Sequence, residues 1–172
     1  MSLADTLRDW RDFYAVIGAA AATLLGAMFV VASLGAGYVT RSHLAGFRLF
    51  VTPIVIHLCV ILFTVAAMVV PGLGSGVLGA VLGAVGIVSL AYSGKVWTRI
   101  NLRDGTDTDD LIWYALVPLP AYAVMVGAAI FLWQGLTMGL YILAAALAVL
   151  LAACIRNAWD MILYFVIKNR RK

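Results

Sequence analysis

The 172-residue sequence contains no glutamate and only two cysteines, and 12% of its residues are charged. A water-soluble domain carries about 25% charged residues, so this chain lacks the charge to cover a soluble surface of the usual kind. Cys59 and Cys154 both lie in apolar runs without partner spacing, which excludes a disulfide scaffold and gives no metal-binding pattern. The scarcity of polar residues also argues against a large soluble catalytic domain.

What the chain has instead is apolar sequence, at 65% of residues and a mean hydropathy of +1.04. Five apolar runs are each long enough to cross about 30 Å of hydrocarbon as a helix. They cover approximately residues 13–38, 49–70, 77–96, 111–133 and 136–167. We therefore predict an all-α polytopic membrane protein, with residues 1–172 forming a single bundle of five transmembrane helices. A short amphipathic segment at 2–12 and a cytoplasmic loop at 97–110 complete the predicted organisation.

Positive charges are distributed unevenly among the connections. If all five runs cross, nine of the twelve Lys and Arg lie on one side and two, Arg8 and Arg11, on the other; Arg156, within the last run, is left out of the count. The positive-inside rule then places the N-terminus outside and the C-terminus in the cytoplasm. A re-entrant hairpin of the second and third runs gives the same count, but both arms are long enough to cross, which favours crossing. Aromatic residues at the ends of the runs, including Tyr14 and Tyr114, fit the same frame.

Small residues recur every four positions in two of the runs. They are Gly18, Ala22 and Gly26 in the first run, and Gly76 and Ala80 in the third, with Gly79 and Gly83 on the adjacent row. Lipid supplies no hydrophobic drive between helices, so such rows serve to let backbones approach. Packing within the bundle and a homo-oligomer face both fit the pattern. In either case we expect the third run to be the most enclosed helix.

Prolines mark a second feature of the fourth run. Pro118 and Pro120 lack an N–H and release the carbonyls four residues back, at Tyr114 and Leu116. A released carbonyl can coordinate an ion or water, or be met by a neighbouring helix at a static kink. Both interpretations remain open from the sequence.

The polar cluster Arg156, Asn157 and Asp160 interrupts the last apolar run. That run is too long for one bilayer, so Arg156 lies near the midplane if Lys168–Lys172 mark the inner interface, and at the inner boundary if the outer turn fixes the depth. Arg156 and Asp160 are four residues apart and can form an ion pair. The cluster is either a mutually satisfied pair that locks the helix or part of a path for ions, protons or a polar substrate.

His57 is the other polar residue deep in an apolar run. Counting inward from Arg48 places it at nearly the depth of Asp160, so the two could share a proton. The alternative is a satisfied core histidine. The candidate polar path therefore comprises Arg156, Asn157, Asp160 and His57.

The polar segment before the fourth run carries little sign of a metal site. The sequence NLRDGTDTDD at 101–110 lacks the ligand spacing of an EF-hand, and Thr108, Asp109 and Asp110 are better explained as helix caps. Lys95, Arg99 and Arg103 form a basic strip suited to lipid head groups. No catalytic motif is present, and we expect no enzyme activity, no catalytic residues, no cofactor, no metal and no nucleic-acid partner.

Two segments carry a family resemblance. GAAAATLLGAMFVVASLGAGYVT in the first run and IRNAWDMILYFV in the last resemble small bacterial inner-membrane proteins, some of which are labelled as modulators of a membrane protease. The resemblance implies a multi-pass protein of the bacterial inner (plasma) membrane and, as an alternative function, a regulatory role. It defines no activity and assigns no residues.

From the residues themselves we expect an oligomeric channel or small transporter for ions or small polar solutes, which uses the polar site in the last helix. The competing class is a non-conducting accessory or regulatory subunit of a larger membrane complex, in which the same residues are structural. The expected partners are membrane lipids and either further copies of the chain or another membrane protein.

Overall fold

The computed structural model describes residues 3–35, 44–102 and 108–169, and these are helical outside short turns. The elements are α1 (Leu3–Gly35), α2 (Leu44–Val69), α3 (Ser75–Asn101), α4 (Thr108–Leu111), the π-helical η2 (Ile112–Leu116), α5 (Pro118–Trp133) and α6 (Met138–Asn169). Within the described residues, five helical segments are long and apolar enough to cross a membrane, the fourth being η2 and α5 together. The predicted all-α architecture with five candidate spans is confirmed.

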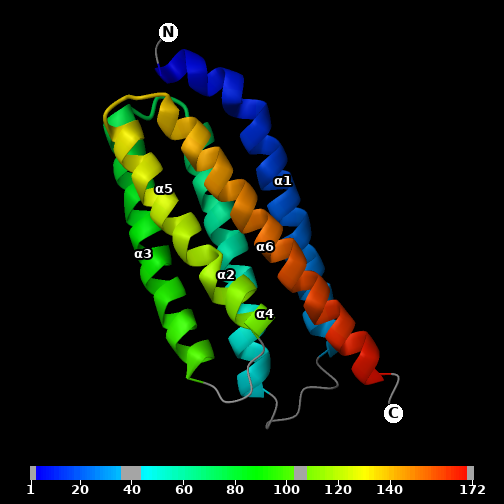
Figure 1. Ribbon diagram of the computed structural model, residues 1–172. Helices are drawn as coiled ribbons and strands as arrows, with labels where there is room; N and C mark the ends of the chain where they lie inside the picture. Colours follow the sequence, from blue (N-terminus) through cyan, green and yellow to red (C-terminus); the bar gives the residue numbers. More distant parts are fainter. Residues whose placement is uncertain (1–2, 36–43, 103–107, 170–172) are drawn as a thin grey trace.

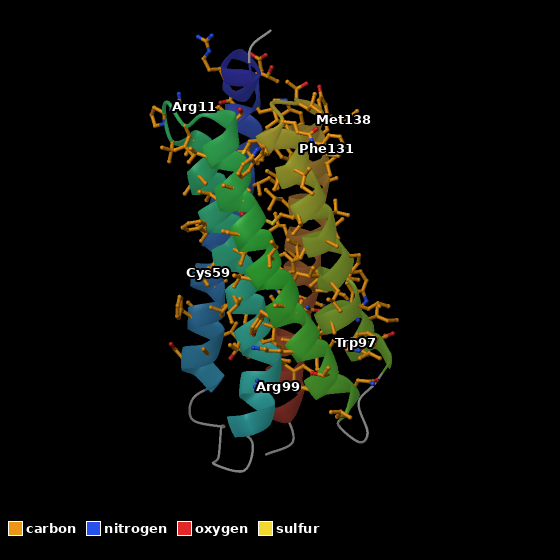
Figure 2. All side chains as sticks on the ribbon, turned by 90° about the vertical axis from the view of Figure 1, so that its left-hand side faces the viewer. Arg11, Cys59, Trp97, Arg99, Phe131 and Met138 are labelled. Carbon is orange, nitrogen blue, oxygen red and sulfur yellow. The ribbon has the colours of Figure 1, made fainter. Side chains whose placement is uncertain are left out.

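The helices lie side by side and alternate in direction, so the two termini are at opposite ends of the bundle (Figure 1). Arg11 lies at the end where the chain begins, and Arg99 lies at the other end (Figure 2). At the first end, Gly135 has a φ of 76° and closes α5. Its N–H donates to the Leu132 carbonyl and the N–H of Leu136 to the Phe131 carbonyl, both at 2.9 Å. This pair of bonds is a Schellman motif, in which glycine supplies the left-handed residue.

The helix boundaries differ from the edges of the apolar runs. α1 is continuous from Leu3, so the segment 2–12 is the beginning of the first helix and not a separate element. α3 continues through its basic residues to Asn101, and α4 begins at Thr108. Both ends of the loop predicted at 97–110 are therefore helical. The helices therefore extend beyond the apolar runs from which they were predicted, because polar side chains do not interrupt backbone hydrogen bonding.

Enclosure is also distributed differently from the prediction. In the 18-residue apolar window of α6, 56% of residues are buried, against 28% in α3. The expectation that the third span is the most enclosed was wrong. α3 lies at the side of the bundle (Figure 1), where its small residues allow close contact on one face only, whereas α6 contacts α1, α2 and α5.

One of the two small-residue rows of α3 makes that contact. A Cβ on Gly79 would lie 2.6 Å from the backbone nitrogen of Trp133, so the backbones of α3 and α5 touch there. A Cβ on Gly83 would lie 3.7 Å from the Ala129 methyl, an ordinary contact distance. Close approach of α3 to α5 therefore depends on glycine at position 79 in particular.

The remaining small residues are divided between packed and outward positions. Gly18 packs against Val65 of α2, whose Cγ1 would lie 3.0 Å from an added Cβ. Ala22 and Ala80 are exposed, and nothing lies within 4 Å of a Cβ placed on Gly26 or Gly76. These last four residues do not pack against another helix of the described chain.

Gly79→Ala is expected to destabilise the bundle by about 1–3 kcal/mol, because its methyl group would meet backbone atoms that cannot move aside independently. Unfolding by SDS titration of the protein in mixed micelles measures the change. Gly76→Ala is the matched control on the neighbouring row and should leave the unfolding free energy unchanged or slightly raised. Equal effects of the two substitutions would contradict the packing described here.

Candidate functional site

The site begins with an irregularity in the fourth span. In η2 the N–H of Val117 donates to the Ile112 carbonyl, five residues back, at 2.8 Å. Val117 would be the ordinary helical donor to the Trp113 carbonyl, and the next residue, Pro118, has no N–H. The π-helical turn and the proline together leave the Trp113 carbonyl without a donor from its own helix.

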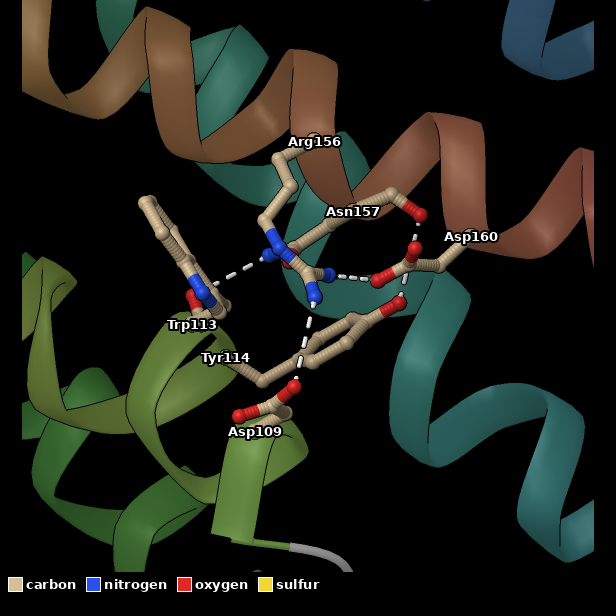
Figure 3. Close-up of polar contacts among 6 residues, drawn as sticks. All are labelled: Asp109, Trp113, Tyr114, Arg156, Asn157 and Asp160. Carbon is tan, nitrogen blue, oxygen red and sulfur yellow. Dashed lines mark hydrogen bonds and ion pairs between the residues drawn. The ribbon is translucent and has the colours of Figure 1, made fainter.

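Asn157 of α6 supplies the missing donor. Its Nδ2 donates to the Trp113 carbonyl at 3.1 Å, and the hydroxyl of Tyr114 donates back to the Asn157 carbonyl at 3.2 Å (Figure 3). Asn157 is almost fully buried. Two hydrogen bonds thus join η2 to α6 at a point where the fourth span cannot satisfy its own backbone.

Arg156 lies beside this joint and forms the predicted ion pair with Asp160, one turn further along α6 (Figure 3). A second carboxylate, that of Asp109 in α4, lies 4.0 Å from the same guanidinium, and the Trp113 ring centroid lies 5.2 Å from it. The side chains of Arg156 and Asp160 are 32% and 31% exposed. The charges are therefore neutralised locally, at the level where α4 leads into the fourth span and thirteen residues before the end of α6.

His57 has a different setting. Its side chain is 1% exposed, and Nδ1 lies 2.6 Å from the hydroxyl of Tyr122 in α5. The ring of Tyr92 in α3 packs edge-on, with centroids 6.3 Å apart. The other ring nitrogen, Nε2, is buried and has no hydrogen-bond partner within the described part of the chain.

The predicted pairing of His57 with Asp160 is not formed. The thiol of Cys154 in α6 lies 3.9 Å from the Ile54 carbonyl in α2, which places these two residues at the same level. His57 and Asp160 lie on opposite sides of that level, so they are separated along the bundle by about 13 Å at 1.5 Å per residue. Depth counted from flanking charges failed because α2 begins at Leu44, before Arg48, and α6 continues to Asn169.

Other sequence predictions have mixed outcomes. Asn157 holds the carbonyl of Trp113, one residue before the Tyr114 carbonyl that the sequence singled out. Asp109, expected to cap a helix, lies in α4 with its carboxylate 4.0 Å from Arg156, and the capping stays a prediction. Lys95 and Arg99 are exposed on α3, and Arg103 lies outside the described residues. The head-group contact proposed for this strip stays a prediction.

The comparisons with protein-family models, curated proteins and solved structures found no match for this chain.

Sequence reasoning missed Tyr122 and took Tyr14 and Tyr114 for interfacial residues. All three are buried, with their hydroxyls bonded to His57, to the Leu140 carbonyl and to the Asn157 carbonyl. The available signal was that a tyrosine within an apolar helix needs a partner for its hydroxyl.

Asn157→Ala is expected to lower the unfolding free energy by about 1–3 kcal/mol, because it leaves a buried carbonyl unpaired. In a Pro118→Ala background the loss should be smaller, since residue 118 then carries an N–H that can reach the Trp113 carbonyl. A double-mutant cycle by SDS unfolding measures this coupling, with the exposed Asn101→Ala as control. Identical losses in both backgrounds would show that Asn157 acts otherwise.

Proposed function

We propose that this protein is a small transporter or channel that moves ions or small polar solutes through the interior of its helical bundle. The observation that supports the proposal is a set of buried polar atoms without hydrogen-bond partners within the described residues. Apart from Arg156 Nη1, which is ion-paired with Asp160, they are His57 Nε2, Thr64 Oγ1, Ser93 Oγ and Asn157 Oδ1. We call these four residues the polar track.

The energetic argument is one of scale. Each unsatisfied buried polar group costs about 1–3 kcal/mol, so four cost about 4–12 kcal/mol. That is comparable with the whole folding free energy of an ordinary domain, about 5–15 kcal/mol. A bundle with a purely structural role would be more stable with apolar residues at these positions. Transient binding of a polar solute or ion would give the four atoms hydrogen-bond partners, and this function would explain why the residues are kept despite their cost in stability.

The position of the polar track supports the same function. Asn157 lies three residues beyond Cys154 in α6, and Thr64 lies ten residues beyond Ile54 in α2, in the opposite direction. With Cys154 and Ile54 level, the track extends over about 20 Å along the bundle, or two thirds of a hydrocarbon core about 30 Å thick. In a bundle that crosses the membrane, the polar track would therefore extend along the membrane normal.

In this proposal the Arg156 cluster and Asn157 have a shared mechanical role. They hold α4 and η2 against α6 at one end of the track. A π-helical turn followed by proline has a weakened backbone ladder, so this segment can move more easily than the rest of the span. Release of the Asn157 amide from Trp113 would open the track at that end.

We further propose the bacterial inner membrane as the location, with the N-terminus outside and the C-terminus in the cytoplasm, on the basis of the charge distribution and the resemblance described above. The outward small residues of α1 and α3 suit a second membrane helix, from another copy or from a larger complex. The alternative function, a non-conducting accessory subunit, rests on the same faces.

Thr64→Val tests the function through a trade-off. Valine removes a buried unpartnered hydroxyl at nearly constant volume, so the unfolding free energy should rise by about 1 kcal/mol. Flux through purified protein in liposomes should fall at least tenfold, with protons, potassium, chloride and glycerol as probes. Thr23→Val is the matched control, because that hydroxyl is exposed and bonds to the Ala19 carbonyl of its own helix.

Two results would contradict the proposal. Liposomes containing the wild-type protein that stay tight to all four probes would favour the accessory subunit, as would co-purification with another membrane protein. Equal flux through wild type and Thr64→Val would remove the polar track from the transport path.

A further inference from the structure

We infer that the proton is an ion that this protein carries, and that His57 and Tyr122 form its binding site within the bundle. The inference rests on the proposed transport function and identifies the chemistry of its central site. Two observations support it: the contact of Nδ1 with Tyr122, and the buried Nε2, which has no hydrogen-bond partner within the described residues.

The surroundings of His57 contain titratable groups but no buried charge. Tyr122 faces it from α5 and Tyr92 from α3, while the thiol of Cys154 in α6 lies 3.9 Å from the Ile54 carbonyl, one turn before His57 in α2. Among the side chains whose burial the structure describes, no Asp, Lys or Arg is buried. A metal cation would need several ligands, and the described residues contain no group of three or more His, Cys, Asp or Glu side chains that could hold one.

A proton needs only one lone pair, whereas a metal cation needs several ligands. The imidazolium that it forms is itself an uncompensated buried charge, so the site would hold the proton only transiently and release it readily. With the ring proton on Nδ1, that N–H donates to the Tyr122 oxygen, and Nε2 presents a lone pair. Uptake of one proton at Nε2 gives an imidazolium whose Nδ1–H still donates to Tyr122. Release from Nε2 restores the neutral ring, so one proton enters, one leaves, and no electrons move.

The other tautomer takes up the proton at the other ring nitrogen. If the Tyr122 hydroxyl donates to Nδ1, the ring proton is on Nε2, and its N–H has no acceptor within the described chain. Uptake of a proton at Nδ1 then requires the Tyr122 hydroxyl to rotate and accept from the new Nδ1–H, and release of the proton from Nε2 restores a neutral ring. In both cases Tyr122 positions the ring, and Nε2 is the nitrogen from which a proton can leave.

The chain contains only two histidines, which allows a direct test. In a His43→Gln background, solid-state ¹⁵N NMR of histidine-labelled protein in bilayers reports on His57 alone. Between about pH 4 and about pH 9, on both sides of the ordinary histidine value of about 6.5, the ring nitrogens should change from the neutral to the imidazolium pattern. Tyr122→Phe should shift that transition, and Tyr141→Phe, at an exposed tyrosine, should not.

A flux assay complements the spectroscopy. In liposomes loaded with a pH-sensitive dye, His57→Gln should lower proton uptake at least tenfold. Tyr122→Phe, which removes only a hydroxyl group and keeps the ring packing, should change its pH dependence. Thr23→Val again serves as the folded control.

The outcomes separate the two proposals. A His57 ring that stays neutral over the whole pH range overturns the inference whether or not the protein conducts. Proton uptake that is unchanged by His57→Gln also overturns it and leaves the transport function intact. Wild-type liposomes tight to every probe instead reject the proposed function itself, whatever the NMR titration shows.

Discussion

The hydrogen bond from the Asn157 amide to the Trp113 carbonyl is the contact on which the candidate site depends. An unpaired carbonyl in an apolar interior is costly, and the π-helical turn before Pro118 creates one that its own helix cannot satisfy. Meeting that demand fixes the rotation and height of α6 against the fourth span. The same register brings the neighbouring Arg156 to the Trp113 ring and to Asp109. The positions of these charged groups thus follow from the need to pair the Trp113 carbonyl.

Two kinds of polar group are separated along the bundle. Arg156 has a partner one turn away on its own helix, is partly exposed and lies at the level where α4 leads into the fourth span. His57 is neutral or singly charged according to its protonation, is fully enclosed, and has one open nitrogen. The charged residue that stands out in the sequence is the better satisfied of the two. The proposed function is therefore better supported at His57, because its buried and unpartnered ring nitrogen lowers the stability of the protein and would be retained only for a function.

The sequence was sufficient to predict what depends on length and composition. Five apolar runs gave five candidate spans, and residues four apart gave the pair of Arg156 and Asp160. It was insufficient wherever the local structure depends on a residue that is distant in the sequence. The π-helical turn depends on an amide 44 positions away from Trp113, and nothing near His57 in the chain indicates Tyr122. Enclosure of α3 was overestimated because a glycine row shows that a face can pack closely, not how many faces do.

The glycine contacts also divide the bundle mechanically. Gly79 and Gly139 bring α3, α5 and α6 together against one another's backbones, and Gly18 brings α1 against a side chain of α2. Between these two groups of helices, the contacts described above are made by side chains, among them the hydrogen bond of His57 to Tyr122. Sliding of one group past the other would therefore break that bond while leaving each glycine seam intact. His57 therefore lies at the boundary between these two groups of helices, at a contact made by side chains.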